Sequence, residues 1–142
     1  MKRLILVLMV LTVTSAVFAQ EPDFDAMYIL FAPNSASLRA VSAAQAVENV
    51  EVFTEVARIL VENPQFRLLI DGHANAVLRT NREEVDRLRP LSRQRAEAAA
   101  DFLVENYRIG RHRLIISNGG GRYPTSTEAN LNRRVNFYFI IP

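Results

Sequence analysis

The chain has 142 residues, with 17 lysines and arginines, 15 aspartates and glutamates, a formal charge of +2 and no cysteine. This length favours one domain with a hydrophobic core of its own. The near-neutral charge argues against nucleic acid as a partner, because its phosphates need a basic surface. Without cysteine, the fold has no disulfides and is stabilised by packing alone.

The N-terminal segment has the pattern of a secretory signal peptide. Lys2 and Arg3 precede an apolar run over residues 4–13, and Val17 and Ala19 supply small residues at the −3 and −1 positions of a cleavage site. The alternative is an uncleaved membrane anchor, but the run is shorter than the roughly 20 apolar residues that span a bilayer. We predict three parts: a signal peptide over 1–19, a loose segment over 20–26 and one domain over 27–142.

Cleavage after residue 19 would leave 123 residues with 15 basic and 15 acidic side chains, a formal charge of zero. Lys2 is the only lysine, so every basic residue that remains is an arginine. Arginine binds carboxylates through a planar, bidentate fork that lysine lacks. Either carboxylate recognition or a compositional bias accounts for this choice.

The first half of the domain alternates strand and helix patterns. The apolar and aromatic run at 27–33 predicts a strand. Between about 43 and 63, apolar residues recur at helical spacing, and Pro64 stops the helix. The continuous apolar centre of 66–72 predicts a strand that is central in its sheet or buried on both faces.

A charged segment opens the second half. Thr80 and Glu83 have the spacing of a capping box, which predicts a short helix that Pro90 ends. The strongest helical pattern covers 91–107, with Ser92 as its N-cap.

Residues 113–117 and 134–141 predict two further strands, with a tight glycine-rich turn at 118–124 between them. The β-α-β-α-β-β order predicts an α/β two-layer sandwich. The first two crossovers contain helices and are long enough to join parallel neighbours. The last connection is short enough to make the final pair antiparallel, which gives a mixed sheet.

The residues offer little support for catalysis or metal binding. His73 and His112 are far apart, and a zinc site lacks further ligands. No serine lies in a G-x-S-x-G elbow, and an Asp71–His73 pairing is common by chance. Neither a lysine nor a helix follows the glycines at 119–121, so they do not match a phosphate loop. We predict no metal, no cofactor and no catalytic residue.

Four blocks together resemble the OmpA-like domain, a peptidoglycan-associating family. The family shows a strand ending in G-H-T-D, an L-S-x-x-R-A helix start, a glycine turn ending near a proline, and N-R-R-V on the last strand. The corresponding blocks are IDGHAN at 70–75, LSRQRA at 91–96, GGGRYP at 119–124 and NRRVNF at 132–137. The resemblance spans roughly 27–141 and implies a mixed sheet with the helices packed on one face.

The resemblance also implies a pocket for a diamino-acid residue of the stem peptide of the cell wall. Arg95 and Arg133 match the family arginines that would hold carboxylate or carbonyl groups. Asn75 stands where the family aspartate meets the ligand's ammonium. His73 would orient the loop, and Ser92, at the helix start, completes the predicted ligand-binding set.

The chain departs from the family pattern at three positions. Ala74 and Asn75 replace the family threonine and aspartate, and Leu88 stands where the family tends to place an asparagine. Charge-assisted hydrogen bonds are roughly twice as strong as neutral ones, so Asn75 predicts weaker or altered recognition.

We therefore predict a non-catalytic module that binds peptidoglycan non-covalently through its stem peptide. A cleaved signal peptide implies the periplasm, or the periplasmic side of the outer membrane. Asn75 also motivates an alternative, a protein-interaction module that docks on an outer-membrane or periplasmic protein. A third interpretation, an enzyme using His73 as a base, lacks a partnered nucleophile.

Overall fold

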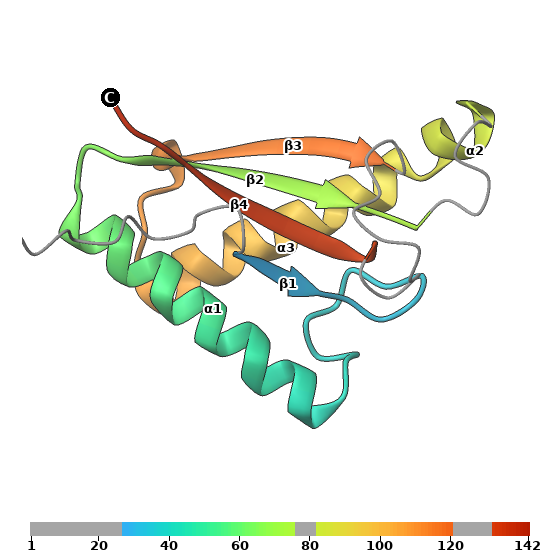
Figure 1. Ribbon diagram of the computed structural model, residues 1–142, viewed down its shortest axis with the longest axis horizontal. Coiled ribbons are helices and arrows are strands. Elements are labelled where there is room, and N and C mark those ends of the chain that lie inside the picture. The colour runs from blue at the N-terminus through green and yellow to red at the C-terminus, as the bar shows by residue number, and fades with distance from the viewer. Residues whose placement is uncertain (1–26, 76–81, 121–131) are drawn as a thin grey trace, which may run out of the picture.

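The elements of the chain follow the predicted order (Figure 1). The computed structural model describes residues 27–75, 82–120 and 132–142, and all elements named here belong to them. They are β1 (Tyr28–Leu30), α1 (Ala43–Glu62), β2 (Arg67–His73), α2 (Arg82–Arg87), α3 (Arg89–Tyr107), the 3-10 turn η2 (Arg111–Arg113), β3 (Leu114–Gly120) and β4 (Arg134–Ile140). The strands form one mixed sheet, and α1 and α3 pack on the same face of it. The α/β two-layer sandwich is confirmed.

The sheet has the strand order β1-β4-β2-β3. As predicted, β2 and β3 are parallel neighbours, joined through α3. β4 lies between β1 and β2 and is antiparallel to both, so the expected pairs β1 with β2 and β3 with β4 were wrong. β4 is central because Val135 and Phe137 are fully buried, whereas β1 has only three residues and takes an edge.

A side chain of α1 covers the free edge of β1. Asn49 Oδ1 accepts a hydrogen bond from the Leu30 N–H (3.1 Å), and its Nδ2 donates to the Leu30 carbonyl (2.9 Å). A strand edge leaves backbone donors and acceptors without partners. The Asn49 amide supplies them and holds α1 against β1.

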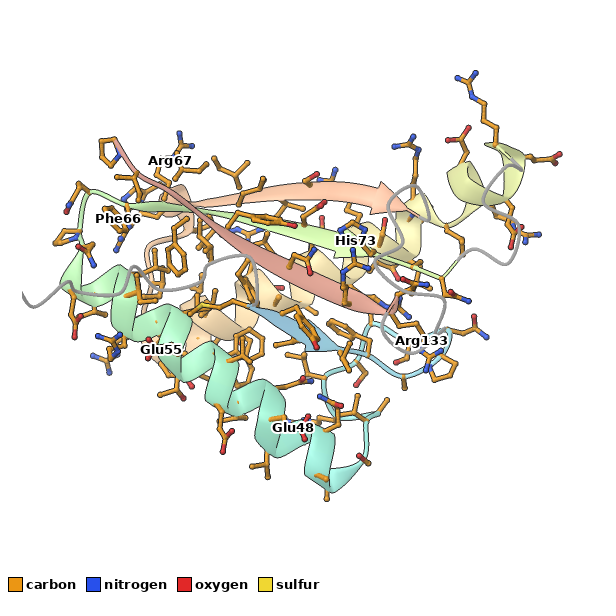
Figure 2. The ribbon with its side chains drawn as sticks, viewed as in Figure 1. Glu48, Glu55, Phe66, Arg67, His73 and Arg133 are labelled. Atoms are coloured by element: carbon orange, nitrogen blue, oxygen red, sulfur yellow. The ribbon has the colours of Figure 1, made fainter. Side chains whose placement is uncertain are left out.

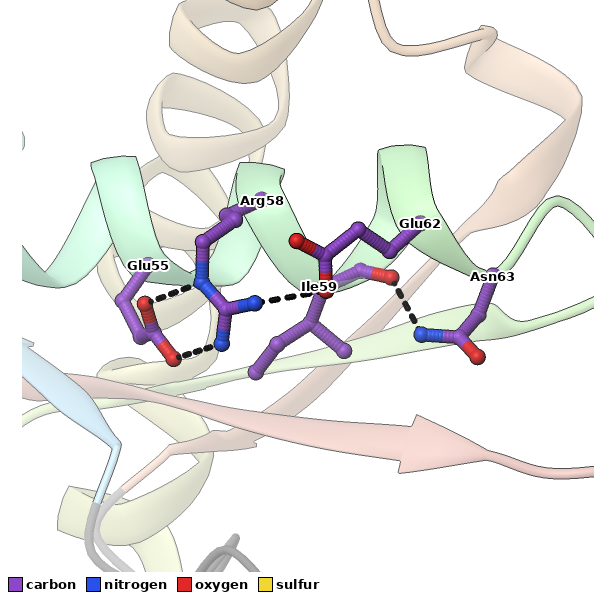
Figure 3. Close-up of polar contacts among 5 residues, drawn as sticks. All are labelled: Glu55, Arg58, Ile59, Glu62 and Asn63. Carbon is purple, nitrogen blue, oxygen red and sulfur yellow. Dashed lines mark hydrogen bonds and ion pairs between the residues drawn. The ribbon is translucent and has the colours of Figure 1, made fainter.

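Polar caps define the two ends of α1. At its start, Ser42 Oγ accepts a hydrogen bond from the Gln45 N–H at 3.2 Å. At its end, the side-chain Nδ2 of Asn63 donates to the Ile59 carbonyl at 2.9 Å (Figure 3). The backbone N–H of Asn63 donates to the same carbonyl at 3.0 Å. The predicted helix over about 43–63 is confirmed.

The two faces of α1 differ in kind. The inner face buries apolar side chains such as Phe53 and Leu60 in the core. On the outer face, Arg58 forms ion pairs with Glu55 and Glu62, both at 2.6 Å (Figure 3). The hydrogen bond from Arg58 lowers the pKa of Glu55, but exposed pairs of this kind contribute little to stability.

α3 begins earlier than the sequence predicted. Leu88 is its N-cap, without a side-chain hydrogen bond, and Pro90 lies in its first turn. The expectations that Pro90 ends the preceding helix and that Ser92 caps this one were wrong. Proline is favoured in a first turn because its missing N–H would have no intrahelical partner there. Ser92 is instead buried inside the helix, and its hydroxyl donates to the Arg89 carbonyl at 2.8 Å.

Gly72 permits the close approach of β2 to α3. A Cβ at this position would lie 1.8 Å from the Ser92 carbonyl oxygen and 3.2 Å from Ala96 Cβ. Only glycine allows backbones to meet at this distance. The core around this contact consists of buried apolar side chains from all the strands and from α1 and α3, among them Ile29, Phe53, Val56, Leu68, Ile70, Ala99, Leu103, Val135 and Phe137.

The predicted glycine turn begins later than expected. Gly119 and Gly120 lie in β3, because β2 extends to His73 and pairs with β3 as far as Gly120. The rest of that turn, Thr80 of the predicted capping box and the predicted signal peptide lie outside the described residues.

Candidate functional site

A pocket of about 210 Å³ lies at the end of the sheet where β2 stops and α3 and β4 begin. Figure 2 shows Arg133 and His73 toward this end, and Phe66 and Arg67 at the opposite one. We call it the arginine pocket. Four segments supply its described lining residues: Pro33 and Asn34 after β1, Ala74 and Asn75 after β2, Leu88, Leu91 and Arg95 at the start of α3, and Arg133 before β4. Three predicted residues from three sequence blocks, Asn75, Arg95 and Arg133, thus line one cavity.

Arg95 lines the arginine pocket and is fully buried. Its Nε donates to the Ser35 carbonyl (2.8 Å), Nη1 to the His73 carbonyl (2.8 Å) and Nη2 to the Ala32 carbonyl (3.1 Å). The guanidinium carbon also lies 5.5 Å from the centre of the Phe31 ring, within reach of a cation–π attraction. Arg95 therefore ties α3 to the segment after β1 and to the end of β2.

The charge of Arg95 has carbonyl partners but no carboxylate partner among the described residues. Burial, and secondarily the charge of Arg133, lowers the pKa of Arg95 to about 10. Arg95 is therefore still cationic at neutral pH. A guanidinium has five N–H groups, and the three bonds use only three of them.

The adjacent arginines at the start of β4 lie in different surroundings. Arg133 is partly exposed, lines the arginine pocket and donates from Nε to the Phe31 carbonyl at 3.3 Å. Arg134 is 3% exposed, and its Nε donates to Asn136 Oδ1 at 3.0 Å. Successive strand residues face opposite sides of a sheet. Arg133 thus offers its guanidinium to the pocket, and Arg134 supports the other face.

Asn75 lies in the wall of the arginine pocket with its amide oxygen already engaged. Its Oδ1 accepts a hydrogen bond from Asn132 Nδ2 at 3.2 Å, and Asn132 is itself buried. An amide oxygen accepts two hydrogen bonds and its nitrogen donates two. Among the described residues, this leaves one lone pair and the Nδ2 hydrogens for a ligand.

The side chains of His73 and Ser92 do not line the pocket. Gly72 faces α3, so alternation places Asp71 and His73 on the opposite face of the sheet. There His73 Nε2 lies 2.9 Å from Asp71 Oδ2. His73 reaches the site only through its carbonyl, which accepts from Arg95, and Ser92 packs against Gly72.

The Asp71 carboxyl is held in its ionised form. Burial raises its pKa, but the hydrogen bond and charge of His73, with Ser117 and Arg134 on neighbouring strands, lower it further than burial raises it. The net pKa of Asp71 lies below its ordinary value of 3.8. The pair therefore stabilises the face of the sheet that the helices leave open.

Sequence reasoning did not find three of the described lining residues, Pro33, Asn34 and Leu91, whereas Leu88 was noted as a departure from the family pattern. Asn34 has a φ of 51°, which asparagine tolerates better than most residues. The Pro-Asn pair is a turn signal that could have indicated this part of the lining, whereas the leucines are typical of any amphipathic helix.

A model of the OmpA family matches residues 30–136 of this chain. The chain belongs to the OmpA family. The resemblance of the four sequence blocks is thereby confirmed, and the pocket of this OmpA-family chain lies where three of those blocks meet.

Solved structures share the fold of this OmpA-family chain. The peptidoglycan-associated lipoprotein from Burkholderia pseudomallei is 20% identical with a TM-score of 0.64, over 80% of this chain and 90% of that chain. The OmpA-like domain of FopA1 from Francisella tularensis is 18% identical with a TM-score of 0.63, over 78% and 68%. The C-terminal domain of Helicobacter pylori MotB is 17% identical with a TM-score of 0.58, over 81% and 84%. A search of curated proteins gave no match.

Two further features concern only the part of the chain that the structure describes. No three side chains of His, Asp or Glu gather there in a way that could hold a metal ion. No helix there has both the length and the apolar character needed to cross a membrane.

Proposed function

We propose that this chain is a non-catalytic periplasmic module that binds peptidoglycan non-covalently through its stem peptide. The observation that carries the proposal is the convergence of Asn75, Arg95 and Arg133 on one pocket in a member of the OmpA family. The fold shared with a peptidoglycan-associated lipoprotein supports it.

The chemistry of the pocket suits a carboxylate on a short aliphatic chain. Arg133 is the accessible guanidinium, and it can hold a carboxylate through two parallel charge-assisted hydrogen bonds. Arg95 adds a positive charge from beneath. Leu88 and Leu91 give apolar contact, and a volume of about 210 Å³ fits one amino-acid-sized group.

We propose a periplasmic location from the signal peptide pattern at residues 1–19. N-terminal sequencing of the protein from the periplasmic fraction tests it. A mature chain that begins near Gln20 is expected, and an intact Met1 in a cytoplasmic fraction would contradict the location.

Cosedimentation with purified wall sacculi tests the proposed function. The wild-type protein is expected in the pellet. Arg133→Gln should weaken binding about 10-fold or more, because it removes a charge-assisted, bidentate contact. Arg93→Gln is the matched control, because Arg93 is an exposed arginine of α3 that pairs with Glu97 outside the pocket. Wild-type protein that stays in the supernatant, or equal losses in both variants, would contradict wall binding.

The second candidate is a module that docks on an outer-membrane or periplasmic protein. The uncharged Asn75 at a position of recognition favours it, because the pocket has lost one charge of the family pattern. Crosslinking in cells distinguishes the two. Recovery of one stoichiometric protein partner without muropeptides would favour docking.

A further inference from the structure

The arginine pocket has an unbalanced charge. Its described lining residues include two guanidinium groups, Arg95 and Arg133, one amide and no carboxylate. The charge of Arg133 adds to burial in lowering the pKa of Arg95, as expected of like charges in close proximity. Any ligand group that enters this pocket therefore meets positive charge.

The buried charge of Arg95 favours an anion in the pocket. A buried cation without an anionic partner is costly, and the three carbonyl acceptors of Arg95 compensate it only in part. A carboxylate held above Arg95 by Arg133 would supply the missing charge. An ammonium in the same place would be repelled by both guanidinium groups.

Asn75 is poorly suited to hold an ammonium. It carries no charge, and one lone pair of its oxygen already accepts from Asn132 at 3.2 Å. Its Nδ2 group remains as a donor, which matches a carbonyl oxygen. The group next to the bound carboxylate is therefore expected to be a neutral amide.

An adjoining pocket provides room for an acyl group on that amide. It has a volume of about 260 Å³ and shares Pro33 and Arg133 with the arginine pocket. Its other described lining residues are mostly apolar and include no carboxylate: Leu30, Phe31, Ala32, Ala40, Val41, Ser42 and Gln45. A ligand can thus continue past Arg133 without meeting a carboxylate of the described lining.

We propose that the arginine pocket binds a carboxylate whose neighbouring amine is acylated, so that a neutral amide and not an ammonium lies beside Asn75. The assignment of this ligand to the stem peptide of the cell wall rests on the proposed function. Within a stem peptide, it selects a diamino-acid residue whose side-chain amine is already joined in an amide bond.

Two small probes test the proposal by nuclear magnetic resonance titration of the isotope-labelled protein at low salt. Nε-acetyl-lysine carries a free ammonium beside its carboxylate, and Nα,Nε-diacetyl-lysine carries an amide there. Both are used as the D and the L isomer. The wild-type protein is expected to bind the diacetyl form about 10-fold more tightly, since like charges disfavour the other probe.

Asn75→Asp should invert this preference. An aspartate at position 75 still accepts the hydrogen bond from Asn132, so the variant keeps the local fold, and it adds the charge that an ammonium requires. Asn106→Asp is the matched control. It makes the same chemical change on the exposed side of α3, outside both pockets, and should leave the ratio of the two affinities unchanged.

Three outcomes would overturn the proposal: equal or tighter binding of Nε-acetyl-lysine by the wild type, an unchanged ratio in Asn75→Asp, or no binding of either probe by protein that sediments with sacculi. Failure of the proposed function would give a different result. The wild-type protein would not cosediment with sacculi, but it would keep its preference for the diacetyl probe.

Discussion

Two arginines tie the two ends of β2 to the rest of the fold, and each donates three hydrogen bonds to backbone carbonyls. Before the start of β2, Arg113 donates from Nε to the Phe66 carbonyl (2.9 Å) and from Nη2 to the Leu60 and Asn63 carbonyls (both 2.8 Å). At the other end, Arg95 bonds to the last carbonyl of β2 and to two carbonyls that follow β1.

The surroundings of the two arginines differ although their bonds are alike. Arg113 is half-buried at the C-terminal end of α1, where the helix macrodipole favours a cation. Arg95 is fully buried beside Arg133, with no helix C-terminus among its acceptors. The charge of Arg113 is thus balanced within the fold, whereas that of Arg95 has a second cation nearby and no helix C-terminus among its acceptors. Hydrogen bonds alone do not distinguish a structural arginine from one in a binding site.

The largest expected difference between the two ends of β2 is the loss of stability on replacing Arg95 or Arg113. Arg95→Met removes a fully buried guanidinium and leaves three carbonyls without donors, one of them buried, and should lower the free energy of unfolding by about 4 kcal/mol. Arg113→Met removes a half-buried guanidinium from three part-buried carbonyls, and should cost about 2 kcal/mol. Urea unfolding measures both values. Equal losses in the two variants would contradict a different role for the two arginines.

The glycines at the two ends should also differ. Gly72→Ala places a Cβ against the Ser92 backbone, and should cost about 3 kcal/mol through overpacking. Gly110→Ala has an ordinary φ of −62° and meets only the ring of His112, an exposed side chain that can move. It should change stability by less than about 0.5 kcal/mol. Thermal unfolding of both variants tests this, and a tolerated Gly72→Ala would contradict the close approach of β2 to α3.

The caps of α1 offer a smaller contrast. Ser42→Ala removes the acceptor of the Gln45 N–H and should cost about 1 kcal/mol. Asn63→Ala should cost about 0.5 kcal/mol, because the backbone N–H of residue 63 keeps its own bond to the Ile59 carbonyl. Urea unfolding orders the two. A larger loss of stability in Asn63→Ala than in Ser42→Ala would contradict this order. It would indicate that the Asn63 side chain helps to hold the end of α1 to which Arg113 bonds.

The smallest expected effect is the contribution of Asp71 to stability at acidic pH. Because the pKa of Asp71 is lower in the folded than in the unfolded chain, unfolding takes up a proton as the pH falls below about 3.8. The stabilisation from Asp71 is therefore complete above this pH and is lost as the pH falls through the folded pKa. Asp71→Asn should reduce the loss of stability in acid, measured as the midpoint of unfolding at pH values from 6 to 2. Identical slopes in the wild type and the variant would exclude Asp71 as its source.

Local patterns determined most of the elements. The helical spacing of apolar residues and the Pro64 signal located α1, and the unbroken apolar run located β2 in the middle of the sheet. These patterns succeed because they depend on the backbone states and buried faces of neighbouring residues. The start of α3 was missed because Pro90 could either end one helix or lie in the first turn of the next, and Ser92 could either cap a helix or lie inside it. In the structure, Ser92 lies inside α3 and packs against Gly72 of β2.

Local sequence patterns predicted the class of fold, the family and the residue types from which a site could be built. Long-range packing places β4 between β1 and β2, turns His73 away from the pocket, and buries Arg95 in the lining of the pocket. Those facts depend on segments that are distant in the chain, since the carbonyl partners of Arg95 lie 22, 60 and 63 residues away from it. A side chain acquires its charge environment from such long-range neighbours, and they bring Arg95 and Arg133 together at the proposed anion site.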